Sequence, residues 1–372
     1  MGTKTKIEWT EATWNPIRGC SIVSEGCRNC YAMRMAHRSN RPSGAYEGLT
    51  RVGAHGPTWT GDVRFVPEAL DYPLRLKKPH RIFVNSMSDL FHEGVPDHEI
   101  DEIFAVMALA PQHTFQILTK RPERMRDYLS EAGRRGEILS AVSREVFDCW
   151  TKKGMPKGPT RDAKWEDDGS GERHVMRVKE FPWPLPNVWL GVSVEDQKTA
   201  DERIPLLLET PAAIRWISAE PLLGPITLTG GLHRRCEPSP HPKFLISKYD
   251  CRKSLRTGAT FYLGEPVGLN WVVAGGESGP KARPMHPDWV RSLRDQCAVA
   301  GVPFFFKQWG AWAPRDFAGV VDRDVQRHRV VFIDRDGDER VGMARGRATM
   351  ERVGKKAAGN ILNGRKHLEY PA

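Results

Sequence analysis

Three cysteines lie close together near the N-terminus, in the stretch GCSIVSEGCRNCYA that covers residues 19–32. Cys20, Cys27 and Cys30 have the spacing C-x6-C-x2-C. A disulfide uses two thiols and a structural zinc site uses four ligands, so three thiols satisfy neither. A four-iron cluster usually takes four thiolates, and with only three of them one iron stays open to an outside ligand. The three cysteines therefore predict a 4Fe-4S cluster.

Zinc is the alternative metal for the same cysteines. A tetrahedral zinc site would need a fourth ligand, which His37, His55 or His92 could supply. A second C-x2-C pair or an H-x3-H pair is absent from the sequence. Cys236 and Cys251 lie far along the chain and are separated by fourteen residues, so they complete no zinc motif.

The composition is ordinary for a globular protein, with 40% hydrophobic and 27% charged residues among 372. No apolar run approaches the roughly 20 residues of a membrane helix, and the start of the chain lacks the apolar core of a signal peptide. We therefore expect a cytoplasmic protein without a membrane partner. Thiols stay reduced in the cytoplasm, which favours metal binding over disulfides.

The net charge of +10 is concentrated in two parts of the chain. Residues 28–81 carry ten Lys and Arg against four Asp and Glu, a net of +6, and residues 228–269 carry seven against three, a net of +4. Such basic fields suit an anionic partner such as nucleic acid, although a scattered basic surface facing solvent is the alternative. The candidate nucleic-acid contacts are Arg34, Arg38, Arg41, Arg51, Lys77, Lys78, Arg234 and Arg235.

Six short apolar runs predict strands that are buried on both faces, as in a parallel sheet. They cover residues 81–86, 114–119, 188–193, 213–218, 271–276 and 303–308. Helical patterns lie between many of them, and one of these helices is expected to begin with a capping box of Thr199 and Glu202. Alternating strands and helices predict an α/β fold, a full or partial (β/α) barrel of about six parallel strands, with a further short strand near TWNPIRG.

We expect the barrel to span residues 1–312 and to carry polar insertions at 134–186 and 228–269. A charged C-terminal extension covers 313–372, where a small hairpin turns at Asp336 and Gly337. Cys297 lies on the apolar stripe of a predicted helix that Gly301 ends, so we interpret it as a buried core thiol.

Polar side chains follow each predicted strand, and the carboxyl ends of barrel strands converge on one mouth where active sites are built. Strands also commonly run into polar loops, but the density of charges here favours a site. The predicted catalytic residues are Glu220, Glu277 and Lys307. The predicted cofactor-binding residues are Tyr31, Asn85, Ser86, Lys120, Ser193 and Glu195.

Several stretches resemble an uncharacterised family of bacteriophage and bacterial proteins that has a three-Cys motif. They are IEWTEATWNPIRGC, GCRNCYA, FVNSMSDLFHEGVP, ILTKRPERM, WLGVSVEDQ, RWISAEPLLGPI, VVAGGESGPKARPMHPDWVRSLRDQC and VPFFFKQWG. That family is in turn similar to radical S-adenosylmethionine enzymes of the spore photoproduct lyase type. The resemblance implies a partial barrel, S-adenosylmethionine on the open iron, an electron donor, and a bacterial or phage-infected host cell.

The sequence departs from the radical-enzyme pattern at three places. The residue before the last cysteine is commonly aromatic, whereas here it is Asn29, with Tyr31 two positions later. The usual cysteine spacing is C-x3-C-x2-C, whereas here the first gap is six residues. The glycine-glycine-glutamate motif usually follows an early strand, whereas residues 275–277 follow a late one. By position, Lys120 and Ser193 resemble the lysine and serine that hold the methionyl carboxylate and the ribose in the lyase type.

The sequence therefore predicts a radical S-adenosylmethionine iron–sulfur enzyme that acts on a nucleic acid or nucleotide, with phage DNA modification or repair as a candidate role. The alternative is a zinc-stabilised nucleic-acid-binding protein without catalysis.

Overall fold

A computed structural model describes most of the chain. The described residues are 5–54, 56–153, 164–167, 174–177, 181–228, 250–253, 260–263, 268–315, 329–340 and 347–372. None of the helices in these ranges is both long and apolar enough to cross a bilayer.

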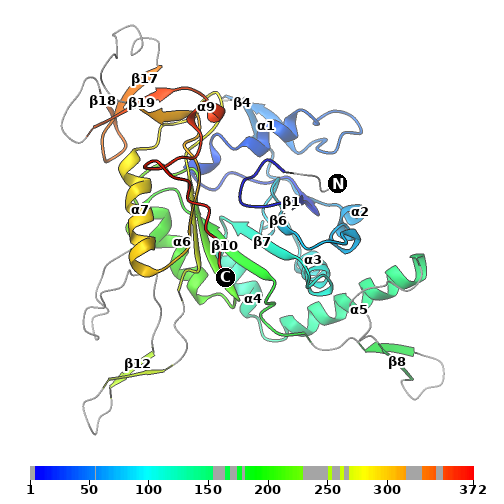
Figure 1. Ribbon diagram of the computed structural model, residues 1–372. Coiled ribbons are helices and arrows are strands. Elements are labelled where there is room, and N and C mark those ends of the chain that lie inside the picture. The colour runs from blue at the N-terminus through cyan, green and yellow to red at the C-terminus, as the bar shows by residue number, and fades with distance from the viewer. Residues whose placement is uncertain are drawn as a thin grey trace. The chain divides into compact units, whose positions relative to one another are not determined.

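The central element is a seven-stranded sheet in the order β1-β6-β7-β10-β11-β14-β15 (Figure 1). The strands are β1 (Ala12–Trp14), β6 (Arg81–Val84), β7 (Thr114–Thr119), β10 (Val188–Ser193), β11 (Ile214–Ala219), β14 (Trp271–Gly275) and β15 (Phe304–Gln308). Parallel pairing joins β1 to β6, β6 to β7, β11 to β14 and β14 to β15. The strand order ends at β1 and β15 without closing, so the fold is a partial (β/α) barrel, as predicted.

The six apolar runs form strands because both of their faces are covered. All five residues of β14 are buried, as are four of the six in β11. Helices follow the strands in the expected alternation: α3 (Asp97–Leu109) after β6, α4 (Pro122–Ser130) after β7, α6 (Gln197–Glu209) after β10 and α7 (Pro287–Ala300) after β14. A parallel sheet requires such crossover connections.

The first of two compact units comprises Met1–Ile22, Ala32–Leu190 and Thr210–Ala213. In it, α3 packs against α5 (Arg134–Lys153) through a buried cluster of Ala105, Ala141 and Val142. The unit also contains α2 (Pro67–Leu70), η2 (Pro73–Arg75) and most of α1 (Tyr31–His37). Its antiparallel pairs are β2 (Ile17–Arg18) with β5 (Arg64–Phe65), β3 (Thr50–Gly53) with β4 (Gly56–Trp59), and β8 (Lys164–Asp167) with β9 (His174–Arg177).

The second compact unit comprises Val23–Tyr31, Gly191–Glu209 and Ile214–Ala372. It contains η1 (Glu25–Cys27), α6, α7 and α9 (Lys355–Ala358). Its four-stranded antiparallel sheet has the order β16 (Trp312–Pro314), β19 (Ala348–Arg352), β17 (Val330–Ile333) and β18 (Glu339–Arg340), and β12 (Asp250–Lys253) pairs with β13 (Thr260–Leu263). The β17–β18 pair confirms the predicted hairpin, and Gly337 supplies a left-handed φ of 100° at its turn.

Two sequence predictions about helix ends have different outcomes. Gly301 ends α7 in the left-handed conformation with φ 66°, and Cys297 is fully buried, so both of these predictions are confirmed. The capping box at Thr199 is wrong. Asp196 caps α6 instead, because its Oδ1 accepts the backbone N–H of Thr199 at 2.8 Å, which places Thr199 three residues inside the cap.

Candidate functional site

None of the three cysteines forms a disulfide within the described residues, and each is half-buried. Cys20 belongs to the first compact unit, whereas Cys27 and Cys30 belong to the second. Within the described residues, no group of three or more His, Cys, Asp or Glu side chains is gathered in a form that could hold a metal.

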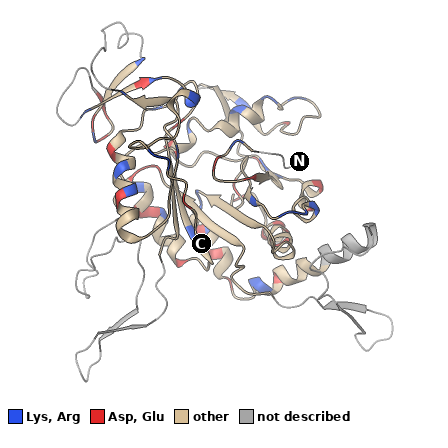
Figure 2. Ribbon diagram, viewed as in Figure 1, with Lys and Arg blue, Asp and Glu red and all other residues tan. Residues whose placement is uncertain are grey.

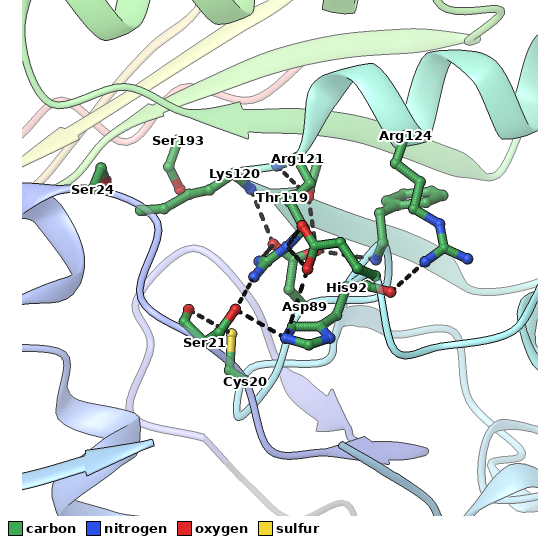
Figure 3. Close-up of polar contacts among 12 residues, drawn as sticks. Cys20, Ser21, Ser24, Asp89, His92, Thr119, Lys120, Arg121, Arg124 and Ser193 are labelled. Carbon is green, nitrogen blue, oxygen red and sulfur yellow. Dashed lines mark hydrogen bonds and ion pairs between the residues drawn. The ribbon is translucent and has the colours of Figure 1, made fainter. Parts of the chain in front are cut away.

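The residue after Cys20 is held by two donors from the ends of β6 and β7 (Figure 3). The Ser21 hydroxyl accepts a hydrogen bond from Arg121 Nη2 at 2.6 Å, and His92 Nε2 lies 3.0 Å from the same oxygen. The Cys20 thiol itself donates to the Ser21 carbonyl at 3.5 Å. Ser21 thus anchors the cysteine to polar groups that follow the strands.

Asp89 fixes Arg121 in place through a buried ion pair. The Arg121 Nη1 to Asp89 Oδ2 distance is 3.0 Å, and the two side chains are 6% and 7% exposed. Asp89 also accepts from the Thr119 hydroxyl at 2.7 Å, from the backbone of Lys120 at 3.1 Å and from the backbone of Phe91 at 3.0 Å. With its lone pairs occupied, this carboxylate is a structural partner of the arginine.

The electrostatics place a cation beside Cys20. Burial alone would lower the pKa of the Arg121 guanidinium, but the neighbouring carboxylates of Asp89 and Glu93 raise it above its ordinary value. Arg121 Nε also pairs with Glu93 at 2.9 Å. Arg121 therefore stays positively charged next to the Cys20 segment.

The hydrogen bonds of His92 define its tautomer. The backbone N–H of Gly94 donates to Nδ1 at 3.1 Å, so the proton sits on Nε2 and is donated to Ser21. Burial lowers the pKa of His92 below its ordinary value, and the Arg121 cation lowers it further. Because both ring nitrogens are occupied, His92 offers no lone pair to zinc.

The two other histidines considered for zinc give no further support. His37 Nδ1 lies 3.1 Å from the Thr50 hydroxyl, and His55 lies outside the described residues.

The chain just before Cys20 is joined to the end of β6. Asn85 has a left-handed φ of 58°, and its Oδ1 accepts the backbone N–H of Ile17 at 3.3 Å. Asn85 is 2% exposed, and its Nδ2 has no hydrogen-bond partner within the described part of the chain. The Ser86 hydroxyl donates to Asn15 Oδ1 at 3.2 Å. Of the predicted cofactor residues here, only Asn85 keeps a buried donor to offer.

In the second unit, Cys27 and Cys30 lie on one tight turn. The backbone N–H of Cys30 donates to the Cys27 carbonyl at 3.1 Å, and that of Cys27 donates to Ser24 at 2.9 Å. The Ser24 hydroxyl donates to Glu195 Oε1 at 2.9 Å. Glu195, which follows β10, is 1% exposed and forms an ion pair of 3.0 Å with Arg203 from α6.

The far side of the same turn contacts the residue that follows β14. Asn29 Nδ2 donates to Glu277 Oε2 at 3.0 Å and to the Lys281 carbonyl at 2.8 Å. Arg283 pairs with Glu277 at 2.7 Å and donates to the Glu25 carbonyl at 3.0 Å. Sequence analysis assigned Glu195 to cofactor binding and Glu277 to catalysis, and the structure places both against the cysteine turn.

Glu220 and Lys307 form a separate acid–base pair at the ends of β11 and β15. The Nζ to Oε1 distance is 3.1 Å, and the side chains are 17% exposed for Lys307 and 13% for Glu220. The Ser218 hydroxyl donates to Glu220 Oε2 at 3.1 Å. Gly275 of the intervening strand makes room, because a Cβ there would lie 2.8 Å from the carboxylate. This pair can exchange a proton with a bound group.

The remaining predicted cofactor residues lie in three environments. Tyr31 begins α1 and is exposed, Lys120 is half-buried beside Arg121, and Ser193 is buried at the end of β10. Lys120 and Tyr31 belong to different compact units.

The predicted nucleic-acid contacts of the first unit lie on its surface. Arg38, Arg41 and Arg51 are exposed, as are Lys77 and Lys78. These five have no ion-pair partner in the described ranges, so their charges are available to an anion. Figure 2 shows the cations of the α1 segment. Arg34 is half-buried in α1, and Arg234 and Arg235 lie outside the described residues.

The residues that hold the site together received no role from the sequence. Asp89 and Arg121 stand after predicted strands, as the predicted site residues do, but their pairing was not visible in the sequence. Arg203 gave no signal, because it lies within an amphipathic helix. Arg283 lies six residues beyond Glu277 in a loop, where a cation has many possible partners.

Cysteine sulfur is the type of donor that an iron–sulfur cluster takes. Cys20, Cys27 and Cys30 are unbridged, partly accessible sulfurs, and each segment is anchored to strand ends. Zinc fits less well, because the structure supplies no fourth ligand from His92.

Comparison with known proteins gives one match. The model of the family described as "Protein of unknown function (DUF5131)" matches residues 4–371. Neither the curated proteins nor the solved structures contain a match to this chain.

Proposed function

For this chain, which belongs to the DUF5131 family, we propose the activity of a radical S-adenosylmethionine iron–sulfur enzyme that acts on a nucleic acid or nucleotide. Cys20, Cys27 and Cys30 would ligate a 4Fe-4S cluster. When bound, the cluster supplies the single electron that cleaves the sulfonium bond of S-adenosylmethionine, and the protein positions the reactants.

One observation carries this proposal: cysteines that form no disulfide in the described residues sit in segments that strand-end side chains hold in place. Arg121 anchors the residue after Cys20, and Glu195 and Glu277 anchor the turn with Cys27 and Cys30. A disordered cysteine loop would need no such contacts. A resident metal group requires cysteines that are held in place and whose sulfurs are not bonded in disulfides.

The cofactor would be bound by the polar groups nearest the ends of β6, β7 and β10. The Asn85 amide has a buried, unused donor, and Lys120 brings a cation that suits a carboxylate. Ser193, Ser86 and Tyr31 supply hydroxyl groups for the remaining polar atoms of S-adenosylmethionine.

The substrate would meet the Glu220–Lys307 pair. Its carboxylate and ammonium are close enough to share a proton at 3.1 Å, and both side chains keep limited contact with solvent. In this arrangement Lys307 donates a proton to a substrate atom, and Glu220 stabilises the ammonium before transfer.

A polyanionic substrate is favoured by the unpaired cations Arg38, Arg41 and Arg51. Replacing all three by alanine should weaken DNA or RNA binding and reduce the slope of log affinity against log salt by about 2.7, at about 0.9 per duplex phosphate contact. Lys198→Ala, which removes a well-exposed charge from α6, is the control. Unchanged binding in the triple variant would point to a small-molecule substrate.

The proposal as a whole is tested by cofactor cleavage. Anaerobically reconstituted and reduced protein should release 5′-deoxyadenosine from S-adenosylmethionine, and Cys30→Ala should abolish this. Met35→Ala, which truncates an exposed side chain of α1, should retain it. Absence of 5′-deoxyadenosine from iron-loaded wild-type protein would contradict the proposed reaction. In the cytoplasm of a bacterium or phage-infected cell, a reduced electron-carrier protein would replace the chemical reductant.

A further inference from the structure

We infer that Glu195 and Glu277 are positioning residues, which hold the turn carrying Cys27 and Cys30 and leave cofactor and substrate to other groups. The inference deepens the proposed function and rests on it, because it takes this turn to be part of a metal centre. It differs from the sequence-based expectation, which gave Glu195 a role in cofactor binding and Glu277 a role in catalysis.

Glu195 accepts three hydrogen bonds from groups of the second unit. Oε1 accepts from the Ser24 hydroxyl at 2.9 Å and from Arg203 Nη1 at 3.3 Å, while Oε2 accepts from the same nitrogen at 3.0 Å. Arg203 Nη1 also donates to the Ser193 carbonyl at 2.7 Å, which fixes the guanidinium against β10. A carboxylate that is 1% exposed and paired in this way cannot receive a ligand without breaking the pair.

Gly26 shows how closely the turn is seated on this carboxylate. A Cβ built on Gly26 would lie 2.3 Å from Glu195 Oε1 and 2.6 Å from its carboxyl carbon. Real Cβ atoms do not approach other atoms so closely, so any side chain at this position would push the turn and Glu195 apart. The backbone next to Cys27 therefore packs directly on the carboxylate.

Glu277 holds the other side of the turn. Its Oε2 accepts from Asn29 Nδ2 at 3.0 Å and from the backbone and Nε of Arg283 at 2.8 and 3.1 Å. The Oε1 atom accepts from Arg283 Nη2 at 2.7 Å. Since Asn29 stands between Cys27 and Cys30 in the sequence, this contact restrains the loop that joins the two cysteines.

Two anchor points fix the turn with little added charge. Ser24 ties the chain ahead of Cys27 and Asn29 ties the chain behind it, so the backbone between the anchors has few alternative conformations. Each carboxylate is neutralised by its own arginine, Glu195 by Arg203 and Glu277 by Arg283. Such preorganisation increases affinity by reducing the entropy lost when both sulfurs bind one group.

The test removes the anchors and leaves the ion pairs intact. Ser24→Ala combined with Asn29→Ala deletes both contacts from the loop side, and neither side chain is buried. Gly26→Ala displaces the turn by steric clash. Gly136→Ala is the matched control, because a Cβ at that position in α5 meets nothing within 4 Å.

The readout is binding of phenylarsine oxide to metal-free protein, since this trivalent arsenical bridges two neighbouring thiols with loss of water. Cys30→Ala defines the signal that belongs to the pair. We expect the double variant and Gly26→Ala to bind at least about tenfold more weakly than wild type, which corresponds to about 1.4 kcal/mol. Gly136→Ala should bind as wild type does. Equal affinity in the double variant, or no pair-dependent binding in wild type, would overturn the positioning role.

Iron content separates this inference from the proposed function. If wild type holds iron after reconstitution and the double variant holds less, both stand. If wild type holds no iron but the arsenical affinities differ as expected, the iron–sulfur proposal fails while the turn is still shown to be held by its anchors. If wild type and the double variant hold iron equally and bind the arsenical equally, the positioning role fails alone.

Discussion

Replacing Arg121 by methionine should destabilise the protein strongly, because it leaves a buried carboxylate without its cation. The Arg121 and Asp89 side chains are 6% and 7% exposed and their charged atoms lie 3.0 Å apart. Breaking a buried ion pair from one side costs about 3–5 kcal/mol. Asp89 keeps three other hydrogen bonds, from Thr119, Lys120 and Phe91, so we expect a loss near the lower limit, about 3 kcal/mol.

The assay is urea unfolding followed by circular dichroism, with Arg126→Met as the matched control. Arg126 lies in α4, and its partner Asp127 is 66% exposed, so its loss should change stability by no more than about 0.5 kcal/mol. Asp89→Asn combined with Arg121→Met should recover part of the loss, because no buried charge remains. A loss in Arg121→Met no larger than that of the control would refute the buried-pair argument.

Four further variants test the rest of the site. The folded-state pKa of His92 is lowered, so wild type should lose stability as the pH falls below the unfolded value of about 6.5, and His92→Gln should reduce this loss in urea titrations at several pH values. Lys120→Ala and Ser193→Ala should weaken S-adenosylmethionine binding in equilibrium dialysis with iron content unchanged, and undiminished affinity in both would remove their assigned roles. Glu220→Gln should lower substrate turnover at least about 100-fold while cofactor binding persists, because it removes the carboxylate that holds the Lys307 ammonium, and turnover at the wild-type rate would remove this role of Glu220.

The strands of the sheet could be predicted from the sequence, because a strand that is buried on both faces has a continuous apolar run. The helices between them could be predicted from their own apolar spacing. The predicted run 114–119 coincides with β7 and the run 188–193 with β10. Local signals also predicted Gly301 as a helix end, since a left-handed residue there favours glycine. The cap of α6 was misplaced by three residues, because Asp196 and Thr199 are both good capping residues and only the fold selects between them.

The candidate site was predicted in its residue types and less well in its roles. Charged side chains do follow the strand ends, but the partners of those side chains are distant in sequence. Asn29 contacts Glu277 across 248 residues, and Ser24 contacts Glu195 across 171. No local pattern encodes such pairs, so a carboxylate that anchors a loop looks the same in the sequence as one that binds a ligand.

The central claim is that Cys20, Cys27 and Cys30 ligate an iron–sulfur cluster, and metal analysis of anaerobically purified protein tests it most directly. Iron, sulfide and zinc should be measured on wild type and on Cys27→Ala before and after reconstitution, together with the electron paramagnetic resonance spectrum of the reduced protein. The account predicts brown wild-type protein with about four irons and four sulfides per chain, and a loss of this cluster in Cys27→Ala. Colourless wild-type protein that holds one zinc and takes up no iron would contradict it.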